Sequence, residues 1–135
     1  GHGYGEIHRK DGTPYKTEKG AFRNHPCTVW ANESLINTRW LIAHGIGLCA
    51  EYTHRYGKKH SCEETILEAA TIIPLQKPTT PKSFTFAGPD EFKHDKSIDL
   101  FTKYQKYIAS KPWTWNNYLR DPSRRPDWLT LYTFL

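Results

Sequence analysis

The chain of 135 residues contains no methionine and only three cysteines, Cys27, Cys49 and Cys62. Because it begins with glycine instead of an initiating methionine, we expect a fragment or a processed product that lacks an N-terminal element. The cysteines do not have the spacing of a disulfide framework, which favours reduced thiols in an intracellular compartment. The fold therefore needs no disulfide.

Long hydrophobic stretches are also missing. No apolar run approaches the roughly 20 residues of a membrane-spanning helix, and the N-terminus has no apolar segment typical of a secretory signal. We therefore expect no membrane partner. Five Trp, eight Tyr and six Phe stand in a chain that is only 37% hydrophobic, so the core must consist of a few large rings. This aromatic content excludes a chain that is disordered throughout.

Positive charge is in excess, with 19 Lys and Arg against 14 Asp and Glu and a formal net charge of +5. Residues 1–24 have no helical or strand periodicity, and we predict a basic N-terminal arm or loop there, suited to an anionic partner. Within it, the pair Asp11-Gly12 could turn a short hairpin.

Hydrophobic residues at spacings of 3, 4 and 7 predict three main helices. Their expected ranges are 34–56, 61–73 and 95–111, and the last is expected to begin at Asp95 or Ser97. The expected buried stripe of the first of these helices consists of Trp40, Leu41, Leu48, Tyr52 and Tyr56.

Glycine and capping residues refine these ranges. Gly57 is expected to end the first helix in the left-handed conformation. Gly45 and Gly47 inside this helix each cost about 1 kcal/mol relative to alanine, so we expect another backbone to approach closely there. Ser61 and Glu64 have the spacing of a capping box at the start of the second helix.

Three prolines, Pro74, Pro78 and Pro81, predict an extended crossover after the second helix. We therefore predict a mainly α protein, a single compact domain of about three main helices with a Pro-rich extended crossover and irregular termini. Its expected parts are the N-terminal arm, residues 1–24, and a helical domain with an aromatic-rich C-terminal tail, residues 25–135.

The densest group of chemically capable side chains lies in residues 51–60. On a helix, Glu51 and Arg55 share a face, and Arg55 could bind a phosphate bidentately. Glu51 and His54 are the candidate catalytic residues of this group. The other candidate nucleic-acid-binding residues here raise the local positive potential, and they are Lys58, Lys59 and His60. The alternative is an ordinary i,i+4 pair beside solvated lysines.

A second group of basic and aromatic residues lies near the C-terminus. Aromatic rings can stack on unpaired bases while arginines bind phosphates. The candidates for this role are Trp113, Trp115, Arg124 and Arg125. The alternative is that these rings fill the core of a small domain that has few aliphatic residues.

The sequence contains no recognisable motif for a metal site or for a catalytic nucleophile. Cysteine and histidine occur in three close pairs, but none has the spacing of the familiar zinc motifs. No signature of a Cys/His nucleophile, phosphate-binding glycine loop or catalytic carboxylate pair is present. We expect no metal and no cofactor.

Several segments resemble one family. Residues Asn24–Trp30, Trp40-Leu41 and Glu51–His60 resemble the central block of small uncharacterised proteins encoded by tailed bacteriophages. The resemblance continues in order to about Trp128, through Gly88–Phe92, Tyr104–Tyr107, Trp113–Trp115 and Arg125–Trp128.

Members of this family are distantly similar in helix order to the phage-type pyrimidine-dimer DNA glycosylase. That enzyme is compact and helical, flips a nucleotide, and cleaves through an N-terminal amine nucleophile with a glutamate partner. The corresponding N-terminal segment precedes the block seen here, so the resemblance assigns no catalytic residue. It implies a DNA-facing scaffold with Arg55, Lys58 and His60 at the helix end and the C-terminal aromatics nearby.

Two functions stay open at this point. The first is a phage-type nucleic-acid-binding protein with single- or double-stranded DNA as its partner, built like a DNA-repair glycosylase and AP lyase without its N-terminal catalytic segment. The second is a structural or interaction component of a virus particle that docks on other protein subunits. These functions imply the cytoplasm of an infected bacterial host or the virion. A metal-dependent enzyme is kept only because the chain has seven histidines.

Overall fold

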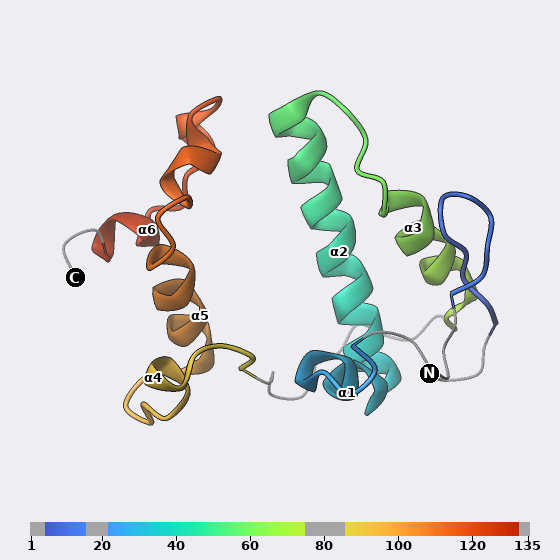
Figure 1. The fold of residues 1–135 in the computed structure, drawn as a ribbon, viewed down its shortest axis with the longest axis horizontal. Coiled ribbons are helices and arrows are strands. Elements are labelled where there is room, and N and C mark those ends of the chain that lie inside the picture. The colour runs from blue at the N-terminus through green and yellow to red at the C-terminus, as the bar shows by residue number, and fades with distance from the viewer. Residues whose placement is uncertain (1–4, 16–21, 75–85, 133–135) are drawn as a thin grey trace. The chain divides into compact units, whose positions relative to one another are not determined.

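The structure is a computed structural model that describes residues 5–15, 22–74 and 86–132 (Figure 1). The described residues are mainly helical, which confirms the predicted fold class. Contacts within the chain group it into two compact units, residues 1–84 and 85–135, and each unit is described by itself. The predicted parts 1–24 and 25–135 stay a prediction. Most of the predicted Pro-rich crossover and both extreme termini lie outside the described residues.

A small hairpin occupies residues 7–15 of the first unit. Its strands meet in a single bridge between His8 and Pro14. The turn contains Gly12, whose positive φ of 86° suits glycine, and Asp11, which accepts a hydrogen bond from the backbone N–H of Thr13 at 2.9 Å. The predicted turn at Asp11-Gly12 is therefore present.

Two helices follow, joined by a tight corner (Figure 1). Helix α1 covers Pro26–Asn32 and begins with Pro26, whose fixed φ suits the first turn of a helix. Helix α2 covers Leu35–Tyr56, and its N-cap Ser34 accepts a hydrogen bond from the backbone N–H of Asn37. Gly57 ends α2 with a left-handed φ of 67°, which confirms its predicted role.

Helix α3 covers Glu63–Ile72 and packs against α2. A Cβ added at Gly45 would lie 3.2 Å from Cδ1 of Ile66 on α3, so a neighbour does approach closely, but it is a side chain and not the expected backbone. At Gly47, no atom of the residues that the structure describes lies within 4 Å of an added Cβ, so no close approach is found there.

The predicted capping box of α3 is wrong. The N-cap is Cys62, and no side chain caps it. Instead, the Nδ1 atom of His60 accepts a hydrogen bond from the backbone N–H of Cys62 at 3.1 Å, and Glu64 binds Lys59. Because Glu64 is paired elsewhere and the helix starts two residues beyond Ser61, the box cannot close.

The predicted buried stripe of α2 is only partly correct. Trp40 and Tyr52 are half-buried, whereas Leu41, Leu48 and Tyr56 are exposed. Helix α2 has 22 residues, but α1 and α3 have only 7 and 10, so they cover a limited part of its surface. The buried side chains of α2 are the polar Asn37 and the small Cys49.

The second unit contains the short helix α4, Asp90–Lys93, and the longer α5, Leu100–Ala109. The predicted start of the last helix at Asp95 or Ser97 is wrong. Asp95 accepts a hydrogen bond from the backbone N–H of Ser97 and closes its own turn, while Asp99 caps α5 by accepting from the N–H of Thr102.

The unit ends in two 3₁₀ turns and a short helix, which are η1 (Trp115–Tyr118), η2 (Pro122–Arg124) and α6 (Trp128–Leu131). Its core contains the buried Phe86, whose ring lies 4.8 Å from that of Tyr104, and the fully buried Leu129. Gly88 is required beside this cluster, because a Cβ there would lie 2.4 Å from the Phe86 ring. Among the described helices, none combines the length and hydropathy that crossing a membrane requires.

Candidate nucleic-acid interface

Basic side chains gather where α2 ends and α3 begins. The left-handed Gly57 reverses the chain, so that residues 58–62 cross directly from one helix to the next. Lys58 and Lys59 are exposed and His60 is half-buried. Three of the predicted nucleic-acid-binding residues therefore lie in the connection between the two helices.

A shallow depression lies beside this connection. Its volume is about 60 Å³, and it is lined by Lys10, Lys59, His60, Ser61 and Glu64. Lys10 comes from the hairpin, far away in sequence from the others. The sequence analysis did not single out Lys10, although the turn signal at Asp11-Gly12 places this lysine at the tip of a hairpin.

Lys59 is held by two carboxylates of the first turn of α3. Its Nζ lies 3.3 Å from Oε1 of Glu64 and 3.5 Å from Oε2 of Glu63. The hydrogen bond with Glu64 raises the pKa of Lys59 above its ordinary value, although desolvation acts in the opposite direction. Lys59 is therefore a firmly charged group whose field is reduced by its acidic neighbours.

His60 is oriented from two sides. Its Nδ1 atom accepts the Cys62 amide hydrogen, and its ring meets the Tyr52 ring edge-on with centroids 4.7 Å apart. Since Nδ1 acts as the acceptor, a neutral His60 carries its hydrogen on Nε2. That nitrogen can donate to an anion.

Arg55 and Glu51 form an ion pair on α2. The Nε of Arg55 lies 3.0 Å from Oε1 of Glu51, and both side chains are largely buried, with exposed fractions of 19% and 24%. This geometry agrees with the alternative of an ordinary i,i+4 ion pair. The Glu51 carboxylate is therefore less accessible to a ligand than an unpaired, exposed carboxylate. His54 is exposed one turn along the helix. Catalytic roles for Glu51 and His54 stay predictions.

The buried Cys49 suits a structural role. Cys49 is buried, and burial, followed by the nearby Glu63 and Cys62, raises the pKa of its thiol. A raised pKa leaves little of the reactive thiolate at neutral pH. In the ranges that the structure describes, no three His, Cys, Asp or Glu side chains come together as a group that could hold a metal ion.

The second unit presents the other predicted residues. Trp113 is 57% exposed, and Nζ of Lys111 lies 5.5 Å from its ring centroid. Trp115 is half-buried, with the guanidinium of Arg125 5.1 Å from its ring centroid. Arg124 is exposed at the end of η2. Trp113 is therefore not core filling, whereas the Trp115 ring is partly covered by a cation.

Comparison with known proteins gives one family. Residues 6–64 match the family described as pyrimidine dimer DNA glycosylase. The matched segment contains the hairpin, α1, α2 and the connection to α3, and thus every basic residue of the depression. Searches of curated proteins and of solved structures find no match. Residues 6–64 of this chain are therefore distantly similar to the pyrimidine dimer DNA glycosylases, as the resemblance predicted.

Proposed function

We propose that this chain binds DNA and has a DNA-repair glycosylase-like function, with a phosphate-binding surface at the connection between α2 and α3. The observation that carries the proposal is the convergence of Lys10, Lys59 and His60 on one depression, inside the segment that matches the glycosylase family. Lys58 is exposed beside them.

The size of the depression favours a backbone phosphate as its occupant. Its volume of about 60 Å³ lies far below the roughly 300–1,000 Å³ of pockets that enclose a ligand. A flipped dinucleotide lesion needs an enclosed pocket of that larger kind, whereas a phosphate needs only convergent donors. Lys10, Lys59 and the Nε2–H of His60 supply such donors, and phosphate contacts position a protein on DNA.

Binding should be measured by fluorescence anisotropy with labelled single- and double-stranded DNA at low and raised salt. Lys58→Ala should lower the affinity for DNA about 2- to 5-fold, which is the usual effect of removing one exposed charge. It should also reduce the salt slope by about 0.9 on duplex DNA, or about 0.7 on a single strand.

Lys93→Ala is the matched control, because Lys93 is an exposed lysine on α4, outside the matched segment. It removes the same charge from the whole chain. Equal weakening by both variants would show that net charge alone attracts DNA, and the proposed surface would be wrong.

Enzymatic activity is tested separately. Duplex DNA with a pyrimidine dimer and the same duplex without it should be compared for strand cleavage, using the wild-type chain, Glu51→Gln and His54→Ala. A glycosylase and AP lyase would cut only the damaged strand. Loss of cutting with retained binding in either variant would support a catalytic role, whereas binding without any cutting would leave a DNA-binding scaffold.

The alternative function is docking on other protein subunits of a virus particle. It is supported by large apolar side chains that are exposed on the second unit, namely Phe101, Trp113, Leu119 and Leu131. Size-exclusion chromatography separates the two functions. Self-association that is insensitive to salt would favour docking, while a monomer that shifts only when DNA is added would favour DNA binding.

A further inference from the structure

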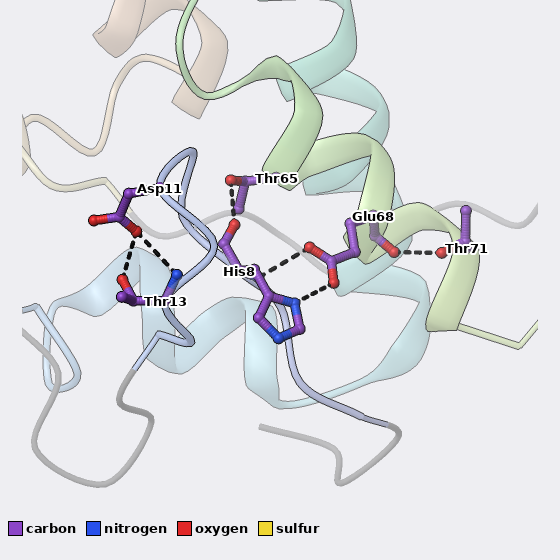
Figure 2. A network of polar contacts seen from close by, with 6 residues as sticks. All are labelled: His8, Asp11, Thr13, Thr65, Glu68 and Thr71. Atoms are coloured by element: carbon purple, nitrogen blue, oxygen red, sulfur yellow. Dashed lines mark hydrogen bonds and ion pairs between the residues drawn. The ribbon is translucent and has the colours of Figure 1, made fainter.

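The hairpin of residues 7–15 is tied to α3 by three hydrogen bonds (Figure 2). The carboxylate of Glu68 on α3 forms two of them. Its Oε2 accepts the backbone N–H of His8 at 2.9 Å, and its Oε1 lies 2.6 Å from Nδ1 of the His8 ring. The hydroxyl of Thr65, one turn earlier on α3, donates to the carbonyl of His8 at 2.6 Å. One residue of the hairpin thus engages two residues of the helix.

These bonds lie two residues from Lys10. The hairpin itself is small, with a single bridge between His8 and Pro14 and cross-strand bonds such as that from the Arg9 N–H to the Thr13 carbonyl at 2.8 Å. An isolated two-stranded hairpin is marginally stable in water. The position of Lys10 in the depression therefore depends on how His8 is held by α3.

We infer that Glu68 is a positioning residue for DNA binding, which acts through His8 to hold Lys10 over the depression. The inference rests on the proposed function, since it assigns the depression to a DNA phosphate. Neither Glu68 nor His8 touches that phosphate. They hold the hairpin in place before DNA binds. Less conformational entropy of Lys10 is then lost on binding, which strengthens the affinity.

Charge and positioning make opposite predictions for Glu68. Its carboxylate repels a polyanion, so its removal strengthens DNA binding if charge alone matters. If Glu68 holds the hairpin, its removal weakens binding instead. The direction of the change therefore separates the two effects.

The experiment measures DNA affinity by anisotropy for Glu68→Ala, Glu64→Ala, Lys10→Ala and the double variant Glu68→Ala/Lys10→Ala. Glu64 is the matched control, because it is another carboxylate of α3, and it binds Lys59 inside the depression. We expect Glu64→Ala to bind more tightly than wild type. Glu68→Ala and Lys10→Ala should each bind about 2- to 5-fold more weakly.

The double variant separates positioning of Lys10 from a general loss of structure, because only positioning makes the effects of the two substitutions non-additive. Once Glu68 is removed, Lys10→Ala should weaken binding no further, while Lys58→Ala should keep its full effect. Thr65→Val removes one bond to His8 without changing the charge, and it should weaken binding in the same direction. Thermal melting of each variant establishes that it is folded.

Tighter binding by Glu68→Ala, or an undiminished effect of Lys10→Ala in its background, would overturn the inference. Failure of the proposed function looks different. In that case Lys58→Ala and Lys93→Ala would weaken binding equally, whatever Glu68 does.

Discussion

The side chain of Asn37 connects the end of α1 to the start of α2. Its Nδ2 donates a hydrogen bond to the backbone carbonyl of Trp30 at 2.8 Å, and both residues are buried. The backbone N–H of Asn37 donates to Oγ of Ser34, the N-cap of α2. The same carbonyl accepts the backbone N–H of Glu33 at 3.2 Å, so the buried amide of Asn37 supplies it with a second donor.

Asn37→Ala is expected to destabilise the chain by about 0.5–1.5 kcal/mol, because it removes one of the two hydrogen bonds to the buried carbonyl of Trp30. The free energy of unfolding should be measured by urea denaturation followed by far-UV circular dichroism. Asn32→Ala is the control, since Asn32 is exposed at the end of α1. Its expected change lies within about 0.5 kcal/mol of zero. Equal stability of the two variants would contradict the structural role of Asn37.

Leu129→Ala should destabilise the second unit by about 2–5 kcal/mol, because Leu129 is fully buried and its truncation leaves a cavity. Leu131 lies on the same short helix with an exposed fraction of 71%, which makes Leu131→Ala a matched control. Denaturation monitored by tryptophan fluorescence measures both variants. A loss of stability in Leu131→Ala as large as in Leu129→Ala would show that α6 packs differently.

The hydrogen bonds from His8 lower the pKa of Glu68, against a weak opposing effect of burial. A carboxyl group with a lowered pKa in the folded state stabilises that state above its unfolded pKa, about 4.3 for glutamate. This stabilisation is lost as the pH falls through the lower pKa of the folded state. Nuclear magnetic resonance of the Glu68 carboxyl carbon should give a titration midpoint below about 4.3.

In His8→Ala the midpoint of Glu68 should rise toward that ordinary value, since the main cause of the lowered pKa is removed. An unchanged midpoint in this variant would show that another group holds Glu68, and the tie between hairpin and α3 would lose its support.

Trp113 offers an exposed ring on which an unpaired base can stack. Its position is fixed by Thr114, which is buried and whose hydroxyl donates to the carbonyl of Ile108 at 2.6 Å. If the second unit takes part in binding, Trp113→Ala should weaken the binding of single-stranded DNA by about 1–3 kcal/mol. Duplex DNA should be affected less, because its bases are already stacked.

Leu119→Ala is the control for Trp113, because Leu119 is an exposed apolar side chain of the same unit without an aromatic face. Anisotropy titrations compare the two variants. If neither variant changes the affinity for single-stranded DNA, Trp113 belongs to the protein-docking alternative.

Local features of this fold could be predicted from the sequence because they depend on neighbouring residues. The turn at Asp11-Gly12 and the left-handed Gly57 at the end of α2 are examples. The start of α5 could not be predicted, because Asp95 and Asp99 can each accept a hydrogen bond from a backbone N–H a few residues later. In the structure both do so, but only the turn that begins at Asp99 continues as a helix.

The candidate site was only half visible in the sequence. Lys58, Lys59 and His60 are adjacent in the chain, so their clustering needs no fold. Lys10 joins Lys59 and His60 through the tertiary fold, in which Glu68 and Thr65 of α3 form hydrogen bonds with His8 of the hairpin. No local pattern links His8 and Glu68, which are 60 residues apart.

The sequence by itself determined the positive charge, the mainly helical class, the similarity to the glycosylase family and the basic stretch after α2, because periodicity, composition and motifs are properties of neighbouring residues. The tertiary structure alone decided which side chains became buried and which basic groups met. Burial along α2 depends on how far the shorter α1 and α3 reach, and the depression depends on hydrogen bonds between distant segments.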